Sequence, residues 1–205
     1  MTKIDFKKTL DSYQAKYNQF RIVTVPKLQH LMVDGHGDPN VAKDFTDAIE
    51  ALYPVAYKIK FASKIERGKD YVVPPLEGLW WAKDMETFTT ARDKSHWDWT
   101  MMVLTPDWIS QDMFLTAVEK VAEKNKPINL DKVRLETLEE GQCVQTLHIG
   151  SYDDEAAILE KMHHEFIPNS GLKMVRKHHE VYFSDFRKVA PDKLRTILRQ
   201  PVVNV

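Results

Sequence analysis

The stretch Leu76-Glu77-Gly78-Leu79-Trp80-Trp81 has a counterpart in the second half of the chain, His179-Glu180-Val181-Tyr182-Phe183-Ser184. In each half this strand-like run follows a Gly-x-x-Asp turn and a helical pattern. Each half then ends in another extended run, at 97–104 in the first and at 194–201 in the second. A repeated strand–helix–strand–strand unit predicts two similar modules about a pseudo-twofold axis, with a shared seam between them.

The hydrophobic pattern sets the expected boundaries of these modules. An apolar stripe over residues 41–59 has the spacing of one helical face, and Pro54 inside it predicts a kink. We expect a single domain over residues 1–205, with a first repeat at about 19–106 and a second at about 130–205. A helix at about 107–126 connects the two repeats.

Composition excludes several classes of protein. The 205 residues include 29 Lys and Arg against 30 Asp and Glu, so no long-range field gathers nucleic acid or an anionic membrane. We find neither a run of about 18 apolar residues nor a signal peptide. The single cysteine, Cys143, rules out an intramolecular disulfide and lies in an apolar run typical of a structural thiol. We expect a cytoplasmic protein.

Aromatic residues gather near the two acidic strand positions. They are Trp80, Trp81, Trp97 and Trp99 in the first half and Tyr152, Tyr182 and Phe183 in the second. Rings with a carboxylate suit a planar, apolar or cationic ligand. The alternative is that the tryptophans form the core of a β-rich protein. Because side chains alternate along a strand, Trp80 and Trp81 cannot both face one cavity.

Glu180 lies in an apolar-patterned strand, directly after two histidines. A carboxylate partly removed from water can take a proton near neutral pH, whereas an edge strand would leave Glu180 in solvent. The runs His163-His164-Glu165 and His178-His179-Glu180 contain metal-ligating residue types. Neither has the i, i+4 histidine pair of a zinc protease, so no metal site and no cofactor are expected.

Taken together, these segments resemble the GyrI-like small-molecule-binding family, which also supplies effector-binding domains to AraC- and MerR-type regulators. The resemblance covers nearly the whole chain from about residue 5. It is carried by the runs at 32–40, 75–81, 96–99, 140–141, 148–152, 178–182 and 196–201.

The resemblance implies an α+β fold in which two strand–helix–strand–strand modules form an antiparallel sheet, with helices packed on one side and a ligand cleft between the modules. It places a glutamate at the position of Glu180 centrally in that cleft. The tryptophan-rich stand-alone branch includes hydrolases of cyclopropane-bearing DNA-alkylating natural products, which implies detoxification and drug resistance. The chain has no amino-terminal helix-turn-helix, so direct transcription control and direct binding of nucleic acid are not expected.

The corresponding mechanism assigns a role to each candidate residue. Glu180 would orient and deprotonate water for attack on the cyclopropane carbon, while Tyr152 or Tyr182 would hydrogen-bond the conjugated carbonyl. Glu77, the counterpart of Glu180, would be a second acid in the cleft or a structural remnant. The expected ligand-binding residues are Glu77, Trp80, Trp97, Trp99 and Met102.

Two other functions remain open from the sequence. The same aromatic cleft would serve a non-catalytic binder or sensor of lipophilic cations, with Glu180 as the counter-charge. A protein-interaction role, such as modulation of DNA gyrase, would favour a strongly acidic surface, which the balanced charge does not provide. The expected partner is a small molecule, with the chain as a monomer or homodimer.

Overall fold

A computed structural model describes residues 2–83, 94–124 and 127–205. The helices are α1 Phe6–Thr9, α2 Lys43–Glu66, α4 Gln111–Lys124, α5 Ala156–Glu160 and α6 Ile167–Asn169, with a π-helical turn, η5 Lys161–Phe166, between the last two. Short 3₁₀ turns are η1 Asp11–Tyr13, η2 Lys94–His96, η3 Leu130–Lys132, η4 Tyr152–Glu155 and η6 Pro191–Lys193. The strands are β1 Arg21–Val25, β2 Leu28–His36, β3 Leu76–Ala82, β4 Trp97–Thr105, β5 Arg134–Leu138, β6 Gly141–Ile149, β7 Leu172–Met174, β8 His178–Tyr182 and β9 Arg195–Asn204.

The strands form one nine-stranded antiparallel sheet in the order β1-β6-β9-β8-β3-β4-β2-β5, with β7 paired to β9 outside this path. The strand order is symmetric about the pair β8–β3, which we call the seam. β2-α2-β3-β4 on one side corresponds to β6-α5-β8-β9 on the other. The predicted α+β fold of two related strand–helix–strand–strand modules is confirmed, and the two strands that open the sequence analysis meet at its centre.

Two outer strands pair with the module that is distant in sequence. β1 precedes the first module but pairs with β6, whereas β5 precedes the second module but pairs with β2. Each half of the sheet therefore includes one strand from the other half of the chain. The pairing of β1 with β6 extends the second half of the sheet with residues that the sequence places in the first repeat.

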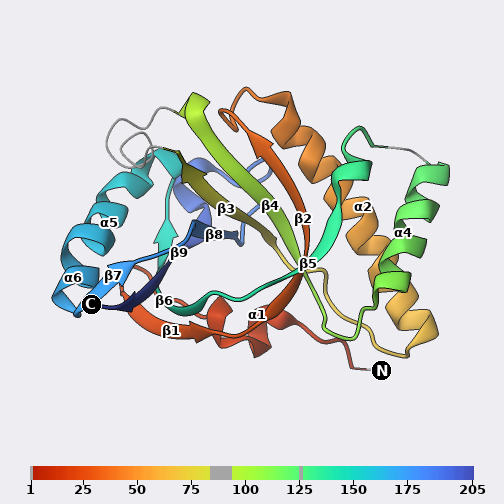
Figure 1. Cartoon of the computed structure of the whole chain (residues 1–205), viewed down its shortest axis with the longest axis horizontal. Helices are drawn as coiled ribbons and strands as arrows, with labels where there is room; N and C mark the ends of the chain where they lie inside the picture. Colours follow the sequence, from red (N-terminus) through yellow and green to blue (C-terminus); the bar gives the residue numbers. More distant parts are fainter. Residues whose placement is uncertain (1, 84–93, 125–126) are drawn as a thin grey trace.

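The principal helices cover one face of the sheet. Glu180 is opposite Leu198 on β9 and Gly78 on β3, and Gly78 is opposite Met101 on β4, so these positions share a face. Met101 packs in the core beneath α2 and α4, and Leu198 packs with Met162 of η5. Figure 1 shows α2 and α4 on one flank of the sheet and α5 and α6 on the other. The packing of Met101 and Leu198 confirms the predicted layer of helices on one face.

The amino-terminal segment covers the opposite face. Ile4 exchanges backbone hydrogen bonds with Asp70 and Val72 at the beginning of this segment. Further along, Tyr13 packs with Val181 of β8 and Ile197 of β9. The amino-terminal segment thus buries side chains of the seam that point away from the helical layer, such as Val181. Within the described ranges, no helix is long and apolar enough to cross a membrane.

Candidate ligand-binding site

A cavity of ≈ 1430 Å³ lies between the two modules on the helical face. Residues of α2 form one wall, and the segment from η4 through η5 forms the other. β3 and β8 provide the floor, while the chain after β8 closes one end. Its described lining includes Phe45, Ile49, Tyr53, Leu76, Trp80, Trp97, Tyr152, Leu159, His163, Glu180, Tyr182 and Phe183.

Glu180 lies on the cavity floor at the centre of the sheet. Its side chain is 12% exposed. The Tyr182 hydroxyl donates a hydrogen bond to Oε2 of Glu180 at 2.6 Å, and Nε1 of Trp80 donates to that hydroxyl at 2.9 Å. On the other side, Nε2 of His178 lies 3.4 Å from Oε1 of Glu180. The two modules therefore share one hydrogen-bonded chain, since Trp80 comes from β3 and Glu180 from β8.

Gly78 gives this chain the room it needs. Gly78 lies opposite Glu180 in the β3–β8 ladder. A Cβ atom added there would lie 2.8 Å from Nε1 of Trp80, 2.8 Å from Cε of Met101 and 3.2 Å from the Tyr182 hydroxyl. Any side chain at this position would displace the groups that hold Glu180, so the cavity floor requires glycine here.

Aromatic rings form the walls around the carboxylate. Trp80 and Trp97 make an edge-to-face pair with ring centroids 5.8 Å apart, and Phe45 of α2 lies 6.1 Å from Trp80. Tyr152 and Tyr182 make a second edge-to-face pair at 5.7 Å. Such a lining presents ring faces and edges to a planar molecule. It also offers π-faces to a cation.

Burial fixes the protonation of several cavity groups. Desolvation, with the charge of Glu180 and the hydrogen bond to it, raises the pKa of Tyr182 well above its usual range. Desolvation and Glu180 likewise raise the pKa of Tyr152. Burial, followed by the neighbouring His178, lowers the pKa of His163 to about 3. Both phenols and the His163 imidazole are therefore neutral near neutral pH.

Charged residues at the cavity are mainly acidic. Asp185 pairs with Arg187 at 2.9 Å, and Lys94 with Asp153 at 3.2 Å, so these rim charges balance. Among the described lining residues, the acids outnumber the bases. The acids are Glu50, Asp153, Glu155, Glu160, Glu180 and Asp185, and the bases are Lys7, Lys94, Arg187 and Lys188. This balance favours a cationic ligand over an anionic one.

The structure brings together five of the eight predicted site residues. Glu180, Tyr152, Tyr182, Trp80 and Trp97 all line the cavity, whereas Glu77, Trp99 and Met102 do not. Trp81 also lies on the opposite face from Trp80, as the alternation predicts, and Lys177 caps its ring at 3.2 Å.

Two of the three remaining residues, Trp99 and Met102, are packed in the core. Trp99 is fully buried and packs over Gly35, where an added Cβ would lie 2.0 Å from the indole ring. Met102 is also fully buried and lies opposite Glu77 on β3, on the face that points away from the cavity. Both positions therefore contribute to the core and not to the cavity lining.

Several cavity residues escaped the sequence analysis. Phe45, Ile49 and Tyr53 of α2 and Leu159 of α5 belong to helical apolar stripes, and their spacing is that of any buried helix face. The feature of the sequence that could have indicated a cavity beside this helix is Tyr53. Its hydroxyl-bearing ring lies on an apolar stripe, one residue before Pro54.

Glu77 belongs to a buried charged cluster on the opposite face. Its Oε1 accepts a hydrogen bond from the Tyr13 hydroxyl at 2.5 Å, and its Oε2 lies 3.0 Å from Nε2 of His179. Nδ1 of His179 lies 2.9 Å from Glu140, which also pairs with Arg199 at 2.9 Å. We call these five residues the back-face cluster. In the described ranges no three metal-ligating side chains are arranged to hold an ion.

Opposite charges offset the desolvation of this cluster. Burial alone would lower the pKa of His179, but the charge of Glu140 and hydrogen bonds to Glu140 and Glu77 raise it to about 9. Burial alone would raise the pKa of Glu77, yet His179 and His30 lower it, as His179 and Arg199 do for Glu140. Two carboxylates thus face an imidazolium and a guanidinium, which lets four ionised groups occupy the interior.

A two-module sheet with an aromatic cavity between its modules defines a small-molecule-binding domain. The sequence profile of the GyrI-like small molecule binding domain matches residues 18–203. The chain therefore belongs to the GyrI-like small-molecule-binding domain family, as its motifs predict. Comparison with curated protein sequences finds no significant match.

Solved structures place the chain beside two proteins of Listeria innocua. A conserved protein described as uncharacterized is 37% identical, with a TM-score of 0.88, and the match covers 98% of this chain and 100% of that one. A protein described as a hydrolase is 36% identical, with a TM-score of 0.85 and the same coverage. The EcmrR C-terminal domain, at 14% identity and a TM-score of 0.56 over 91% of this chain and 98% of that one, shares the fold.

Proposed function

We propose that the protein binds planar, apolar or cationic small molecules against Glu180 and hydrolyses cyclopropane-bearing genotoxins by adding water to the strained ring. The observation that carries this proposal is the chain from Trp80 through Tyr182 to Glu180 on the floor of an aromatic cavity. It holds one carboxylate oxygen in a fixed place and leaves the carboxylate at the cavity surface. A positioned carboxylate beside a flat apolar slot can direct water at a bound electrophile.

The proposed reaction is a net addition of water. Glu180 takes a proton from a water molecule while the water oxygen forms a bond to a cyclopropane carbon. The ring C–C bond breaks, and its electron pair moves into the conjugated carbonyl, whose oxygen becomes a phenolate and then takes up a proton. The product is a ring-opened alcohol that no longer alkylates DNA. General-base help of this kind contributes about 10²–10⁴-fold to rate.

The hydrogen-bond pattern supports different roles for the two tyrosines. Tyr182 donates its only hydroxyl hydrogen to Glu180, so it orients the base and cannot also donate to a substrate carbonyl. Tyr152 stands edge to face against Tyr182 and lines the same cavity, which makes it the phenol for the carbonyl oxygen. Trp80, Trp97 and Phe45 hold the flat part of the substrate.

The comparisons support hydrolysis over other reactions, because a protein described as a hydrolase shares 36% of its residues with this chain over essentially full length. A second candidate function is a non-catalytic binder of lipophilic cations. The excess of acids around the cavity favours it, because an aromatic box with carboxylates suits a cation without any chemistry.

Mass spectrometry separates the two functions. A cyclopropane-bearing alkylator of the duocarmycin type is incubated with wild type, with Glu180→Gln and with Glu160→Gln. Glu160 is an exposed cavity-rim acid, so its variant makes the same chemical change away from the floor. We expect a water adduct, with mass increased by one water, from wild type and Glu160→Gln, and a rate lower by about 10²–10⁴-fold from Glu180→Gln.

Unchanged compound with all three proteins would exclude the hydrolase and leave the binder. An adduct formed at the wild-type rate by Glu180→Gln would show that another group activates the water.

A further inference from the structure

The solvent-facing side of α2 is unusually apolar. Tyr57 and Phe61, one turn apart, are 50% and 51% exposed, and Pro54 precedes them by one turn on the same side. An amphipathic surface helix normally presents charged and polar residues to solvent, so adjacent exposed apolar side chains mark a binding surface.

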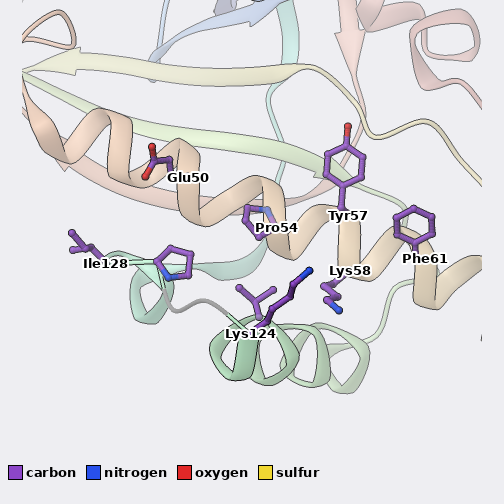
Figure 2. Close-up of a pocket in the computed structure, with 9 residues that line it drawn as sticks. Glu50, Pro54, Tyr57, Lys58, Phe61, Lys124 and Ile128 are labelled. Atoms are coloured by element: carbon purple, nitrogen blue, oxygen red, sulfur yellow. The ribbon is translucent and has the colours of Figure 1, made fainter.

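These residues border a second hollow, a groove of ≈ 910 Å³ between α2 and α4. Figure 2 shows the groove with Phe61 on α2 and Lys124 on the facing helix. We call it the outer groove. Its described lining is Glu50, Pro54, Tyr57, Lys58, Phe61, Val121, Lys124, Pro127 and Ile128.

The outer groove adjoins the main cavity along α2. Glu50, Pro54 and Tyr57 line both hollows, so they form a shared edge along α2. The ring of Tyr53, inside the main cavity, lies 6.4 Å from the ring of Tyr57. Aromatic surface therefore continues from the cavity over the helix and into the groove.

Pro54 adds a polar feature to this shared edge. Proline has no backbone N–H, so the carbonyl of Glu50, one turn earlier, lacks the helical donor it would otherwise have. The crossing point thus combines an apolar pyrrolidine ring, two phenol rings and a backbone acceptor, which are groups that contact an organic molecule.

We propose that the outer groove is a second subsite that binds the apolar distal part of an elongated ligand, whose planar or cationic part lies against Glu180. This inference rests on the proposed function of the main cavity. It narrows the ligand class to molecules with two linked segments, a flat head and an apolar extension. A compact planar molecule fills only the main cavity.

The rise of α2 sets the length of the ligand's extension, and the charges in the outer groove set the chemistry of its end. From Tyr53 to Phe61, α2 rises roughly 12 Å at 1.5 Å per residue, so the extension must span about that length. Lys58 and Lys124 contribute two basic side chains to the lining of the groove, against one acidic side chain, Glu50. The far end of the ligand therefore suits a carbonyl acceptor better than a second cation.

A matched series of probes tests the subsite. The head is an N-alkyl quinolinium with a methyl group, with an extended tail that ends in a primary amide, or with an equally long tail that ends in ammonium. Affinities are measured by calorimetry with wild type, Phe61→Ser, Ile128→Ser and Ile65→Ser. Ile65 is 81% exposed on α2 and outside the groove, and Ile128 is 69% exposed, so none of these changes opens the core.

We expect the amide-tailed probe to bind wild type and Ile65→Ser about tenfold more tightly than the methyl probe. Phe61→Ser and Ile128→Ser should each remove most of that gain without weakening the methyl probe. The ammonium tail should gain less than the amide tail.

A tail that brings no gain, or a gain that survives both groove substitutions, would overturn the subsite. So would a Phe61→Ser variant that weakens the methyl and amide probes equally, since that result indicates an indirect effect on the main cavity. Equal affinities of the methyl probe for wild type and for Glu180→Gln, measured in the same way, would instead count against the proposed function, while a tail gain that depends on Phe61 would still support the groove.

Discussion

Glu77 and Glu180 lie on opposite faces of the β3–β8 ladder, although the sequence aligns them as counterparts. Glu180 is opposite Gly78, and Glu77 is opposite Val181. Because side chains alternate along a strand, this offset of one residue sends Glu180 into the cavity and Glu77 into the back-face cluster. One glutamate faces the cavity, and the other belongs to the interior.

The same substitution should therefore lower the stability of the protein at Glu77 and leave it nearly unchanged at Glu180. Glu77→Gln removes the charge that faces His179, and disruption of a buried pair costs about 3–5 kcal/mol. We expect the free energy of unfolding in urea to fall by about that amount. Glu180→Gln should change it by less than about 1 kcal/mol, because the glutamine oxygen can still accept the hydrogen bond from the Tyr182 hydroxyl. Equal losses from both substitutions would contradict this division.

The back-face cluster should make stability depend on pH. The pKa of His179 is about 9 in the folded protein, above its ordinary value of 6.5, so protonation of His179 favours the folded state. Its contribution is complete below about pH 6.5 and is lost as the pH rises through 9, amounting to up to about 3 kcal/mol. Urea unfolding at pH 6.5 and 9.5 measures the loss.

Nitrogen-15 NMR of the His179 imidazole provides an independent check that needs no variant. It should report a protonated ring at pH 8. A neutral ring at pH 8, or a wild-type unfolding free energy that does not change between pH 6.5 and 9.5, would contradict the assigned charges.

Tyr182→Phe tests the hydrogen-bonded chain. The substitution removes the donor to Glu180 and leaves the Trp80 indole N–H without its acceptor. Leaving a buried donor unpaired costs about 1–3 kcal/mol, which unfolding experiments measure. Turnover of the cyclopropane substrate should fall about 10- to 100-fold, since hydrogen bonds to charged groups contribute about 1.5–3 kcal/mol. Tyr17→Phe is the matched control, because Tyr17 is half exposed and lines neither the cavity nor the outer groove; an equal loss of turnover in both variants would rule out a specific role for Tyr182.

Gly78→Ala should damage the site while the fold persists. The added methyl would lie 2.8 Å from Trp80 and Met101, so those side chains must shift, at a typical cost of about 1–3 kcal/mol. We expect weaker ligand binding, measured by tryptophan fluorescence, with an unchanged far-ultraviolet circular dichroism spectrum. Wild-type affinity in Gly78→Ala would show that the Trp80–Tyr182–Glu180 geometry is not required.

Much of the fold follows from local pattern. The repeat predicted two modules, and the period of two along 97–104 placed Trp97, Trp99 and Met101 on one face, where they pack beneath α2. The pairing of β1 with β6 could not be predicted, because the partners are more than 100 residues apart and nothing in either strand specifies the other. Strand order depends on the completed tertiary structure.

Whether a residue lines the cavity could be predicted where alternation along one strand determines it, but not where it depends on contacts between several strands. Alternation along β8 places Glu180 and Tyr182 on one face, and the structure brings both to the cavity. Whether Trp99 reaches that cavity depends on Gly35 of a neighbouring strand, which accommodates its ring. The back-face cluster had a visible signal, since Glu77, His179 and Arg199 interrupt apolar strands, but their pairing depends on register.

The most direct test of the account is the affinity of a planar aromatic cation for wild type and Glu180→Gln, compared with that of a neutral ligand of the same shape. We predict that Glu180→Gln weakens the cation by about tenfold or more and changes the neutral ligand little, because the carboxylate supplies charge and the rings supply shape. Equal affinities of the cation for both proteins would contradict the central claim that Glu180 is the recognition group of the cavity.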